Sequence, residues 1–170
     1  MQILITGGAG FIGCNLAAKG IREGHAITVL DNLSRAGSFL NLEWLRSLGK
    51  FDFVVADIRD FDTLSDLLNA QKYDAIFHDS AQVAVTTSVE DPRTDFEINA
   101  LGTFNLLEAI RLSESDPVLI YASTNKVYGA LPSLNIGEKN GRYSFRDQPD
   151  GVPETMPLDF HSPYGCSKGA

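Results

Sequence analysis

The sequence predicts an α/β fold: a Rossmann-like, doubly wound parallel sheet with helices on both faces. Three observations predict this fold. Short apolar segments alternate with helical patterns from residue 2 to residue 122, a glycine-rich turn directly follows the first apolar segment, and polar residues follow the predicted strands. Because parallel strands bring their carboxyl ends to one edge of a sheet, we expect these polar residues to line a shared ligand site.

The glycine-rich turn is the segment Thr6–Gly13, between the apolar residues 3–5 and the helical residues 14–19. Its glycines fit both G-x-G-x-x-G and G-x-x-G-x-x-G, so the register is open, and a turn without a ligand is the alternative. Glycine lets the backbone approach a pyrophosphate closely, and the free N–H groups of the following helix face the anion. We therefore expect a dinucleotide to contact Gly7, Gly10, Phe11, Ile12 and Gly13.

Asp31 ends the second predicted strand, residues 26–30, and follows Gly10 by about 20 residues, the offset of the ribose-binding acid in dinucleotide-binding folds. A carboxylate there accepts hydrogen bonds from both ribose hydroxyls and repels a 2′-phosphate, so NAD is favoured over NADP. Arg35 lies close behind and could offset part of that repulsion. An ordinary acid at a strand end is the alternative.

Further elements continue the alternation of strands and helices. Leu64, Leu67 and Leu68 have the i, i+3, i+4 spacing of an amphipathic helix. The predicted helices are residues 40–48, 63–71 and 95–112, and the predicted strands are residues 51–55, 73–78 and 117–122.

Residues 131–160 contain scattered prolines and glycines and no clear period, which is long for a connection within a compact domain. The segment is either a mobile functional loop or a small excursion over the edge that holds the active site. We expect the mobile loop.

The composition narrows the class of protein. With 170 residues, 44% of them hydrophobic, the chain can form one domain with a substantial core. The formal net charge of −8 argues against binding nucleic acid or an anionic membrane. The sequence contains neither a signal-peptide pattern nor the roughly 20 apolar residues of a membrane span. Cys14 and Cys166 lack disulfide or metal-ligand spacing, so we expect reduced thiols, no metal and a cytoplasmic location.

A second polar cluster joins Thr124, after the fifth predicted strand, to Tyr164 and Lys168. At their i, i+4 spacing, Tyr164 and Lys168 share one face of a helix. An ammonium group beside a phenol favours the phenolate, so Tyr164 would accept a proton near neutral pH, and the Thr124 hydroxyl could hold a substrate alcohol. Y-x-x-x-K alone also occurs by chance on surface helices. After a dinucleotide turn, it predicts that these three residues are catalytic and act with a nicotinamide.

The sequence resembles the extended short-chain dehydrogenases/reductases, in particular the NAD-dependent sugar epimerase/dehydratase family. The resemblance implies a tightly bound NAD, with Asp31 on the adenosine ribose and Lys168 on the nicotinamide ribose. It implies that Asp57 and Ile58 lie near the adenine, and that Asn99 is a positioning residue in the nicotinamide region. Further cofactor contacts are expected from Asn32, Ser80, Ala81 and Tyr164. The matching residues are Thr6–Gly13, Asp31, Asn32, Asp57, Ile58, Asn99, Gly102, Thr103, Thr124, Val127, Tyr128, Gly129, Tyr164 and Lys168.

Two places depart from the family pattern. Asp79 follows His78 where many members have leucine, which puts an acid in a normally apolar position under the cofactor. Asn125 and Lys126 occupy the positions where the family's dehydratases have the Asp-Glu pair that eliminates water. The resemblance therefore implies an isomerase, an epimerase that oxidises its nucleotide-sugar substrate transiently to a keto-sugar and reduces it again.

Within the family the sequence is most similar to the 2-epimerases of CDP-hexoses. A UDP-hexose 4-epimerase and a non-catalytic NAD-binding sensor or scaffold are the alternatives. Because the family has its sixth strand and sugar-nucleotide pocket further along the chain, we expect residues 1–170 to be an incomplete NAD-binding domain with little activity alone. Family members often dimerise through two long helices, so residues 95–112 are a candidate contact for a homo-oligomer, although an apolar helix face also suits a plain core.

Overall fold

The computed structural model describes residues 1–170 and contains a five-stranded parallel sheet with the strand order β3-β2-β1-β4-β5. This topology confirms the predicted Rossmann-like fold. The chain proceeds from β1 outward to β3 and then returns to β4 on the other side of β1, so the winding reverses between β1 and β4. The strands are β1 (Gln2–Thr6), β2 (Ala26–Asp31), β3 (Asp52–Val55), β4 (Ala75–His78) and β5 (Val118–Tyr121).

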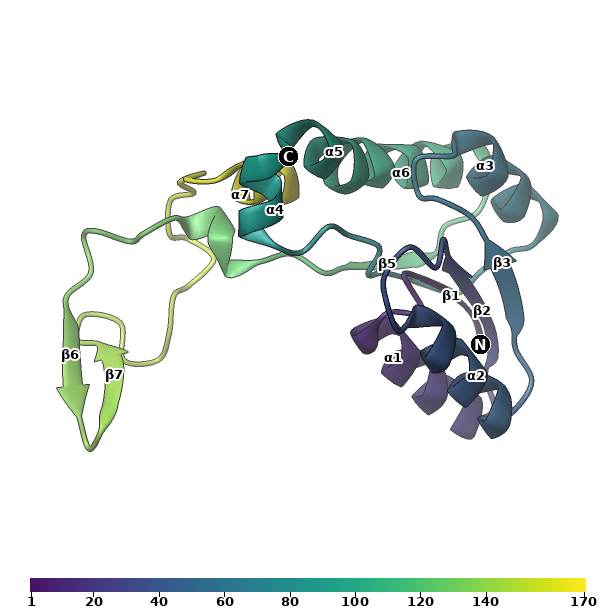
Figure 1. Cartoon of the computed structure of the whole chain (residues 1–170), viewed down its shortest axis with the longest axis horizontal. Helices are drawn as coiled ribbons and strands as arrows, with labels where there is room; N and C mark the ends of the chain where they lie inside the picture. Colours follow the sequence, from purple (N-terminus) through teal and green to yellow (C-terminus); the bar gives the residue numbers. More distant parts are fainter.

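Helices cover both faces of the sheet (Figure 1). Alternate residues of β1 serve two separate cores: Ile3 and Ile5 pack toward one helical layer, and Leu4 packs toward the other. Burial on both faces explains why the strands read as continuous apolar runs. One layer consists of α1 (Phe11–Arg22) and α2 (Ser38–Leu48), and the other consists of α3 (Phe61–Ala70) and α6 (Gly102–Leu112).

The long helix predicted for residues 95–112 consists of three consecutive parts: α5 (Pro92–Phe96), a π-helical turn (Glu97–Leu101) and α6. The Asp91 carboxylate accepts a hydrogen bond from the N–H of Thr94, so the helix begins earlier than predicted. A short helix that the sequence did not predict, α4 (Val85–Glu90), precedes it. Its six residues are too few to establish a helical period.

The expectation of an irregular loop over residues 131–160 is wrong in its middle part. There β6 (Ile136–Lys139) and β7 (Arg142–Phe145) form an antiparallel hairpin that projects away from the sheet (Figure 1). Asn140 and Gly141 form its turn with φ angles of 55° and 73°. Positive φ at both central residues is typical of the type I′ turn, for which Asn-Gly is a strong signal. The sequence therefore contained a hairpin signal that its lack of periodicity obscured.

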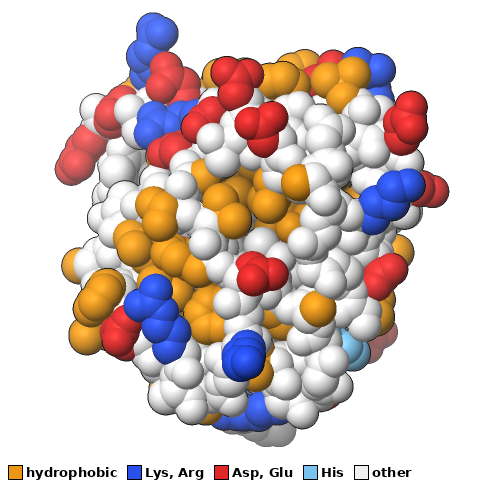
Figure 2. Space-filling view, turned by 90° about the vertical axis from the view of Figure 1, so that its right-hand side faces the viewer, with side chains coloured by type: hydrophobic (Ala, Val, Ile, Leu, Met, Phe, Trp, Pro, Cys, Tyr) orange, Lys and Arg blue, Asp and Glu red, His pale blue; other side chains and the backbone are white.

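After the hairpin the chain returns to the sheet edge in α7 (Pro163–Gly169), which contacts α4, α5 and a 3₁₀ turn (Asn125–Tyr128). On the opposite side of the molecule, hydrophobic side chains gather in the middle of the face and most charged side chains lie around it (Figure 2). β3 is the edge strand there, and its Val55 is exposed. None of the helices has the length and hydropathy needed to span a bilayer.

Candidate active site

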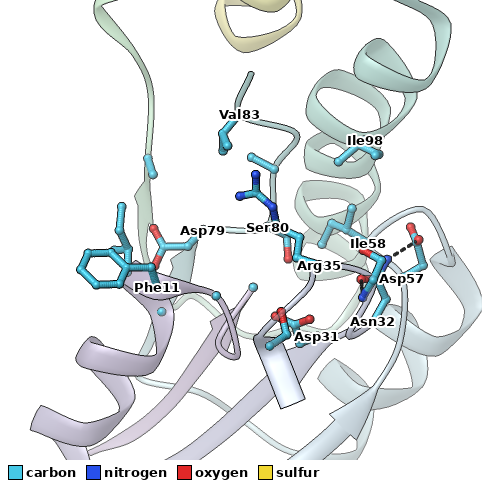
Figure 3. Close-up of a pocket in the computed structure, with 18 of the residues that line it drawn as sticks. Phe11, Asp31, Asn32, Arg35, Asp57, Ile58, Asp79, Ser80, Val83 and Ile98 are labelled. Carbon is cyan, nitrogen blue, oxygen red and sulfur yellow. Dashed lines mark hydrogen bonds between the residues drawn. The ribbon is translucent and has the colours of Figure 1, made fainter. Parts of the chain in front are cut away.

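A cavity of about 450 Å³ opens at the carboxyl ends of the strands (Figure 3). The segments that follow all five strands contribute to it, and α7 closes it from the other side. Most of the residues predicted to bind a dinucleotide therefore lie together. Those that line the cavity are Gly7, Gly10, Phe11, Ile12, Gly13, Asp31, Asn32, Asp57, Ile58, Ser80, Ala81, Tyr164 and Lys168.

The turn after β1 requires glycine where the backbone is closely packed. Gly7 has a φ of +70°, and a Cβ at this position would lie 2.7 Å from the backbone nitrogen of Ser80. A Cβ at Gly13 would overlap the carbonyl oxygen of Gly7. Gly7, Gly10 and Gly13 line the cavity, whereas Gly8 does not. The structure thus favours the G-x-x-G-x-x-G register that the sequence left open.

The first turn of α1 presents unpaired backbone donors. The N–H groups of Phe11, Ile12 and Gly13 have no acceptor in the protein, and no side chain caps the helix. Phe11 and Ile12 are exposed, with 82% and 59% of their surface accessible. Free N–H groups and the helix dipole together make this turn suitable for a phosphate group.

The carboxylate of Asp31 is held in place at the end of β2. Its Oδ2 accepts a hydrogen bond from the N–H of Ala9 at 3.0 Å, and its Oδ1 accepts one from the N–H of Leu33 at 2.8 Å. Each oxygen keeps further acceptor capacity for a ligand hydroxyl. Arg35, also from the segment after β2, lines the same part of the cavity (Figure 3).

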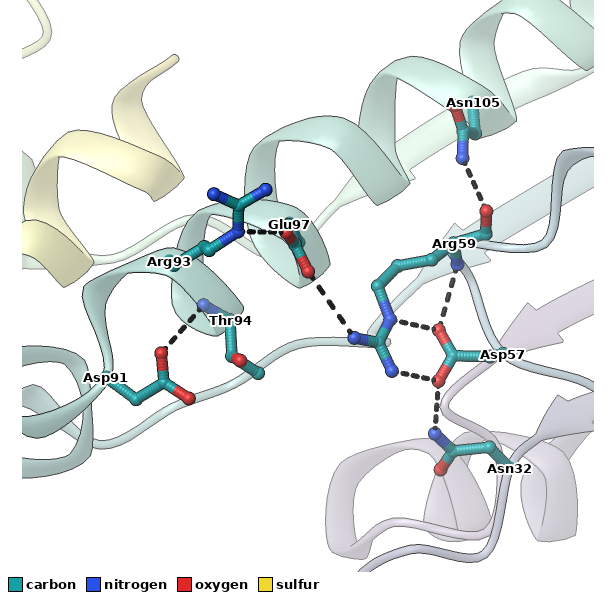
Figure 4. Close-up of polar contacts among 8 residues, drawn as sticks. All are labelled: Asn32, Asp57, Arg59, Asp91, Arg93, Thr94, Glu97 and Asn105. Carbon is teal, nitrogen blue, oxygen red and sulfur yellow. Dashed lines mark hydrogen bonds and ion pairs between the residues drawn. The ribbon is translucent and has the colours of Figure 1, made fainter.

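Asp57, after β3, belongs to a charged network (Figure 4). Arg59 donates to its two oxygens from Nε at 2.8 Å and from Nη2 at 2.9 Å, and the Asn32 amide donates to Oδ2 at 2.8 Å. The Arg59 guanidinium holds the pKa of Asp57 well below its usual range. Arg59 also lies 3.8 Å from Glu97, so the network joins the end of β3 to the π-helical turn.

Asn99 lies behind the cavity and does not line it. Its side chain is buried, its Oδ1 accepts from the N–H of Gln82 at 2.9 Å, and its Nδ2 lies 3.1 Å from the Gln82 carbonyl oxygen. The same Nδ2 contacts Asp95 Oδ1 at 3.2 Å and Ser167 Oγ at 3.1 Å. Asn99 therefore connects the segment after β4 to α5 and α7.

α7 carries Tyr164 and Lys168 into the cavity wall. The Ser162 hydroxyl accepts from the N–H of Gly165 at 3.0 Å and caps the helix, and the N–H of Tyr164 donates to Ser88 Oγ in α4 at 3.2 Å. Both Tyr164 and Lys168 are buried, as expected for two residues on one inward helix face. Burial lowers the pKa of Lys168 to about 8.

Thr124 lies next to the cavity and is not part of its wall, whereas its neighbour Ser123 is. The Thr124 hydroxyl caps the 3₁₀ turn by accepting from the N–H of Lys126 at 3.2 Å. Asn125 and Lys126 are exposed. Two of the three predicted catalytic residues, Tyr164 and Lys168, thus line the cavity, and Thr124 lies outside its wall beside Ser123.

His78 is a buried structural residue. Its Nε2 lies 2.9 Å from Thr103 Oγ1. The Thr103 hydroxyl donates its proton to the Asn99 carbonyl oxygen at 2.6 Å, so it can only accept from His78. The imidazole proton is therefore on Nε2. Its Nδ1 then accepts from Thr6 Oγ1 at 2.7 Å. Burial lowers the pKa of His78 to about 3, so the neutral ring links β1, β4 and α6.

Several residues of the wall were not predicted as site residues. Most are small, apolar or hydroxyl side chains in segments directly after strands, and the general rule that ligands bind at strand ends was their only sequence signal. Arg35 and Asp79 had a further signal, since Arg35 closely follows Asp31 and Asp79 departs from the family pattern. They are Ser34, Arg35, Ser38, Ala56, Asp79, Val83, Ile98, Ala122 and Ser123.

Comparisons with known proteins agree with this geometry. The chain is 52% identical to CDP-paratose 2-epimerase from Salmonella typhi over all of its 170 residues, which cover 50% of that relative. Its structure matches the UDP-Glc/GlcNAc 4-epimerase of Campylobacter jejuni with a TM-score of 0.79 and 34% identity, over 98% of this chain and 45% of that one. It also matches the UDP-glucose 4-epimerase of Thermus thermophilus in complex with NAD, with a TM-score of 0.77 and 36% identity, over 99% of this chain and 47% of that one.

These comparisons confirm the resemblance to sugar epimerases and dehydratases. The chain spans about half the length of the relatives that it matches. The family described as GDP-mannose 4,6 dehydratase matches residues 4–170. The chain therefore belongs to the GDP-mannose 4,6 dehydratase family.

Proposed function

We propose that the whole protein binds NAD in this cavity. The free N–H groups at the start of α1 suit the pyrophosphate, and the Asp31 carboxylate suits the adenosine ribose without a 2′-phosphate. Asp57 and Ile58 are the residues for the adenine, and Lys168 is the residue for the nicotinamide ribose. The similarity to epimerases with bound NAD supports this assignment.

We propose that the reaction is the 2-epimerisation of CDP-paratose and CDP-tyvelose. The observation that carries an epimerase is the presence of Tyr164 and Lys168 in the wall of the same cavity as the dinucleotide turn. The substrate and the carbon rest on the 52% identity to CDP-paratose 2-epimerase.

In this mechanism, bound NAD⁺ would supply a reversible hydride acceptor for the sugar carbon that is oxidised and reduced again. Tyr164, as phenolate, takes the proton of the reacting sugar hydroxyl and later gives it back, so no net oxidation occurs. The Lys168 ammonium stabilises the phenolate. The hydroxyl of Ser123, in the cavity wall, and that of its neighbour Thr124 orient the sugar.

The residues around Thr124 support epimerisation over dehydration. Elimination of water requires an acid and a base near the sugar, and the exposed Asn125 and Lys126 supply no carboxylate. A UDP-hexose 4-epimerase is the second candidate, because solved UDP-glucose 4-epimerases match the fold at 34% and 36% identity.

One experiment separates these functions. The whole protein is incubated separately with CDP-paratose, UDP-glucose and dTDP-glucose, and the products are identified by NMR. We expect CDP-tyvelose from the first and no turnover of the others. Formation of UDP-galactose would favour the 4-epimerase, a 4-keto-6-deoxy sugar would favour a dehydratase, and no turnover together with NAD binding would favour a sensor.

We also propose that residues beyond 170 supply the sugar-nucleotide pocket, so residues 1–170 alone would bind NAD with little turnover. A comparison of kcat between residues 1–170 and the whole protein tests this proposal.

We propose a second copy of the protein as a partner, because apolar side chains are exposed along the continuous helix of α5, the π-helical turn and α6. Light scattering would reveal such a dimer. These side chains are Phe96, Leu101, Phe104 and Leu107.

We also propose a cytoplasmic location. Two free thiols, Cys14 and Cys166, support it.

A further inference from the structure

The carboxylate of Asp79 lines the cavity and has no role in the mechanism above. The residue directly follows β4, and its N–H donates to the carbonyl oxygen of Thr6 at 3.1 Å, so its backbone position is fixed by the sheet. Its Oδ2 is buried and has no hydrogen-bond partner. A buried carboxyl oxygen without a donor is costly, and a positive charge nearby reduces the cost of ionising such a group.

Lys168 has the complementary property. Its side chain is buried, its Nζ lies 4.1 Å from the centre of the Tyr121 ring, and no protein acceptor is hydrogen-bonded to that nitrogen. Burial lowers the pKa of Lys168 to about 8, and the charges of Asp79 and Asp95 oppose this effect. Burial raises the pKa of Asp79, and the Lys168 charge opposes this effect. The charge of Lys168 near neutral pH thus depends on the acids that face it.

Asp95, on α5, is already compensated. Its Oδ1 accepts from the side-chain amides of Gln82 at 2.9 Å and Asn99 at 3.2 Å, and its Oδ2 accepts from Ser167 Oγ at 2.5 Å. These donors stabilise its negative charge and reduce its dependence on Lys168.

The other titratable groups around Lys168 carry no negative charge that could hold it. His78, on β4, is neutral because its pKa is about 3. Tyr121, on β5, offers its ring face, and its hydroxyl donates to the backbone carbonyl oxygen of Lys168. Tyr164, on α7, is the residue whose phenolate the Lys168 ammonium stabilises in the proposed reaction. Among the groups that face Lys168, the carboxylate of Asp79 is therefore the negative charge without compensation of its own.

We propose that Asp79 is a positioning residue whose carboxylate acts across the cavity to keep the Lys168 ammonium charged and directed at the nicotinamide end. The two side chains form no direct ion pair, so the Asp79 carboxylate acts on the Lys168 ammonium through its electric field. Charges interact more strongly across a partly desolvated cavity than in water. The proposal rests on the proposed function, because it concerns the lysine of that site. It adds Asp79 to the residues that keep Lys168 positively charged beside Tyr164.

The test is a lysine ¹³Cε NMR titration of the whole protein, freed of nucleotide. The Lys168 signal is assigned by its loss in Lys168→Arg. We expect Asp79→Asn and Asp79→Leu to lower the pKa of Lys168 by about 1, the effect of one charge at moderate screening. Asp79→Glu should largely preserve it, and Asp66→Asn, an exposed acid on α3, should leave it unchanged.

A second readout is the pH profile of kcat/KM. Because loss of Asp79 makes Lys168 lose its proton at lower pH, the alkaline limb should move to lower pH in Asp79→Asn. If the Lys168 pKa is the same in wild type and Asp79→Asn, the proposal is overturned. A higher melting temperature of Asp79→Leu would then show that Asp79 only occupies space in the wall. A lowered Lys168 pKa in a protein that converts no CDP-sugar would support the role of Asp79 and contradict the proposed function instead.

Discussion

Ser167 donates a hydrogen bond of 2.5 Å to the buried carboxylate of Asp95. This contact joins α7, which carries Tyr164 and Lys168, to α5, which packs against it. The position of the proposed proton acceptor therefore depends on a buried polar contact outside the cavity.

Removing this hydroxyl should reduce both stability and turnover. We expect Ser167→Ala to lower the free energy of unfolding by about 1.5–3 kcal/mol, the range for a hydrogen bond to a charged group. Because α7 would be held less firmly, kcat should fall more than KM changes. Urea unfolding and steady-state kinetics measure both effects. Cys166→Ser, at an exposed position on the same helix, is the control, and equal unfolding free energies for the two variants would contradict the prediction.

His78 should make the protein sensitive to acid. Its pKa is about 3 in the folded chain, against 6.5 for an ordinary histidine, so the unfolded state binds more protons between these values. Stability should thus be complete above pH 6.5 and fall by about 1.4 kcal/mol for each pH unit below about 6. Denaturant unfolding from pH 4 to 8 measures this slope. His78→Gln should have a shallower slope despite its lower stability, and exposed His161→Gln should retain the wild-type slope.

Asp31 should determine the choice of dinucleotide. Asp31→Ser removes a carboxylate that is oriented by two backbone N–H groups, so we expect NAD to bind roughly 10- to 100-fold more weakly. NADP should bind more tightly than to wild type, because its 2′-phosphate no longer meets a negative charge. Calorimetric titration with both dinucleotides checks this. Asp52→Asn, at the start of the neighbouring strand β3, should change neither affinity. An unchanged NAD/NADP ratio in Asp31→Ser would refute the assignment.

Gly13 should tolerate no side chain. In Gly13→Ala the new Cβ overlaps the carbonyl oxygen of Gly7, so the turn must open and its N–H groups move away from the anion site. We expect a loss of roughly 1–3 kcal/mol in stability and at least about tenfold in NAD affinity. Gly24→Asn is the control, because a side chain at that position enters open space, and asparagine tolerates the positive φ there. Wild-type NAD affinity in Gly13→Ala would show that the pyrophosphate lies elsewhere.

The sequence allowed the sheet and most of the cavity wall to be predicted, because apolar strands, glycine spacing and strand-end acids are local signals. Asp31 and Gly13 are examples: one follows from its offset, the other from the packing of a turn. Asn99 was assigned to the nicotinamide region, but no local pattern reveals that its side chain is enclosed by Gln82, Asp95 and Ser167. Such contacts join positions far apart in the chain.

The charge relation between Asp79 and Lys168 was equally beyond local reasoning. The sequence marks Asp79 only as an acid in an apolar context, and its place in the same cavity wall as Lys168 depends on how α7 packs. The hairpin of β6 and β7 is a different case, since Asn140-Gly141 is a local turn signal that does not depend on periodicity.

The central claim is that a hydride leaves the reacting sugar carbon and returns to the same carbon with inversion. The most direct measurement uses CDP-paratose labelled with deuterium at C2, incubated with the whole protein in ordinary water and analysed by NMR and mass spectrometry. We expect CDP-tyvelose that keeps the deuterium at C2, with a rate in Tyr164→Phe at least about a hundredfold lower. Product that has lost its deuterium to the solvent would indicate proton exchange in place of hydride return and would contradict the account.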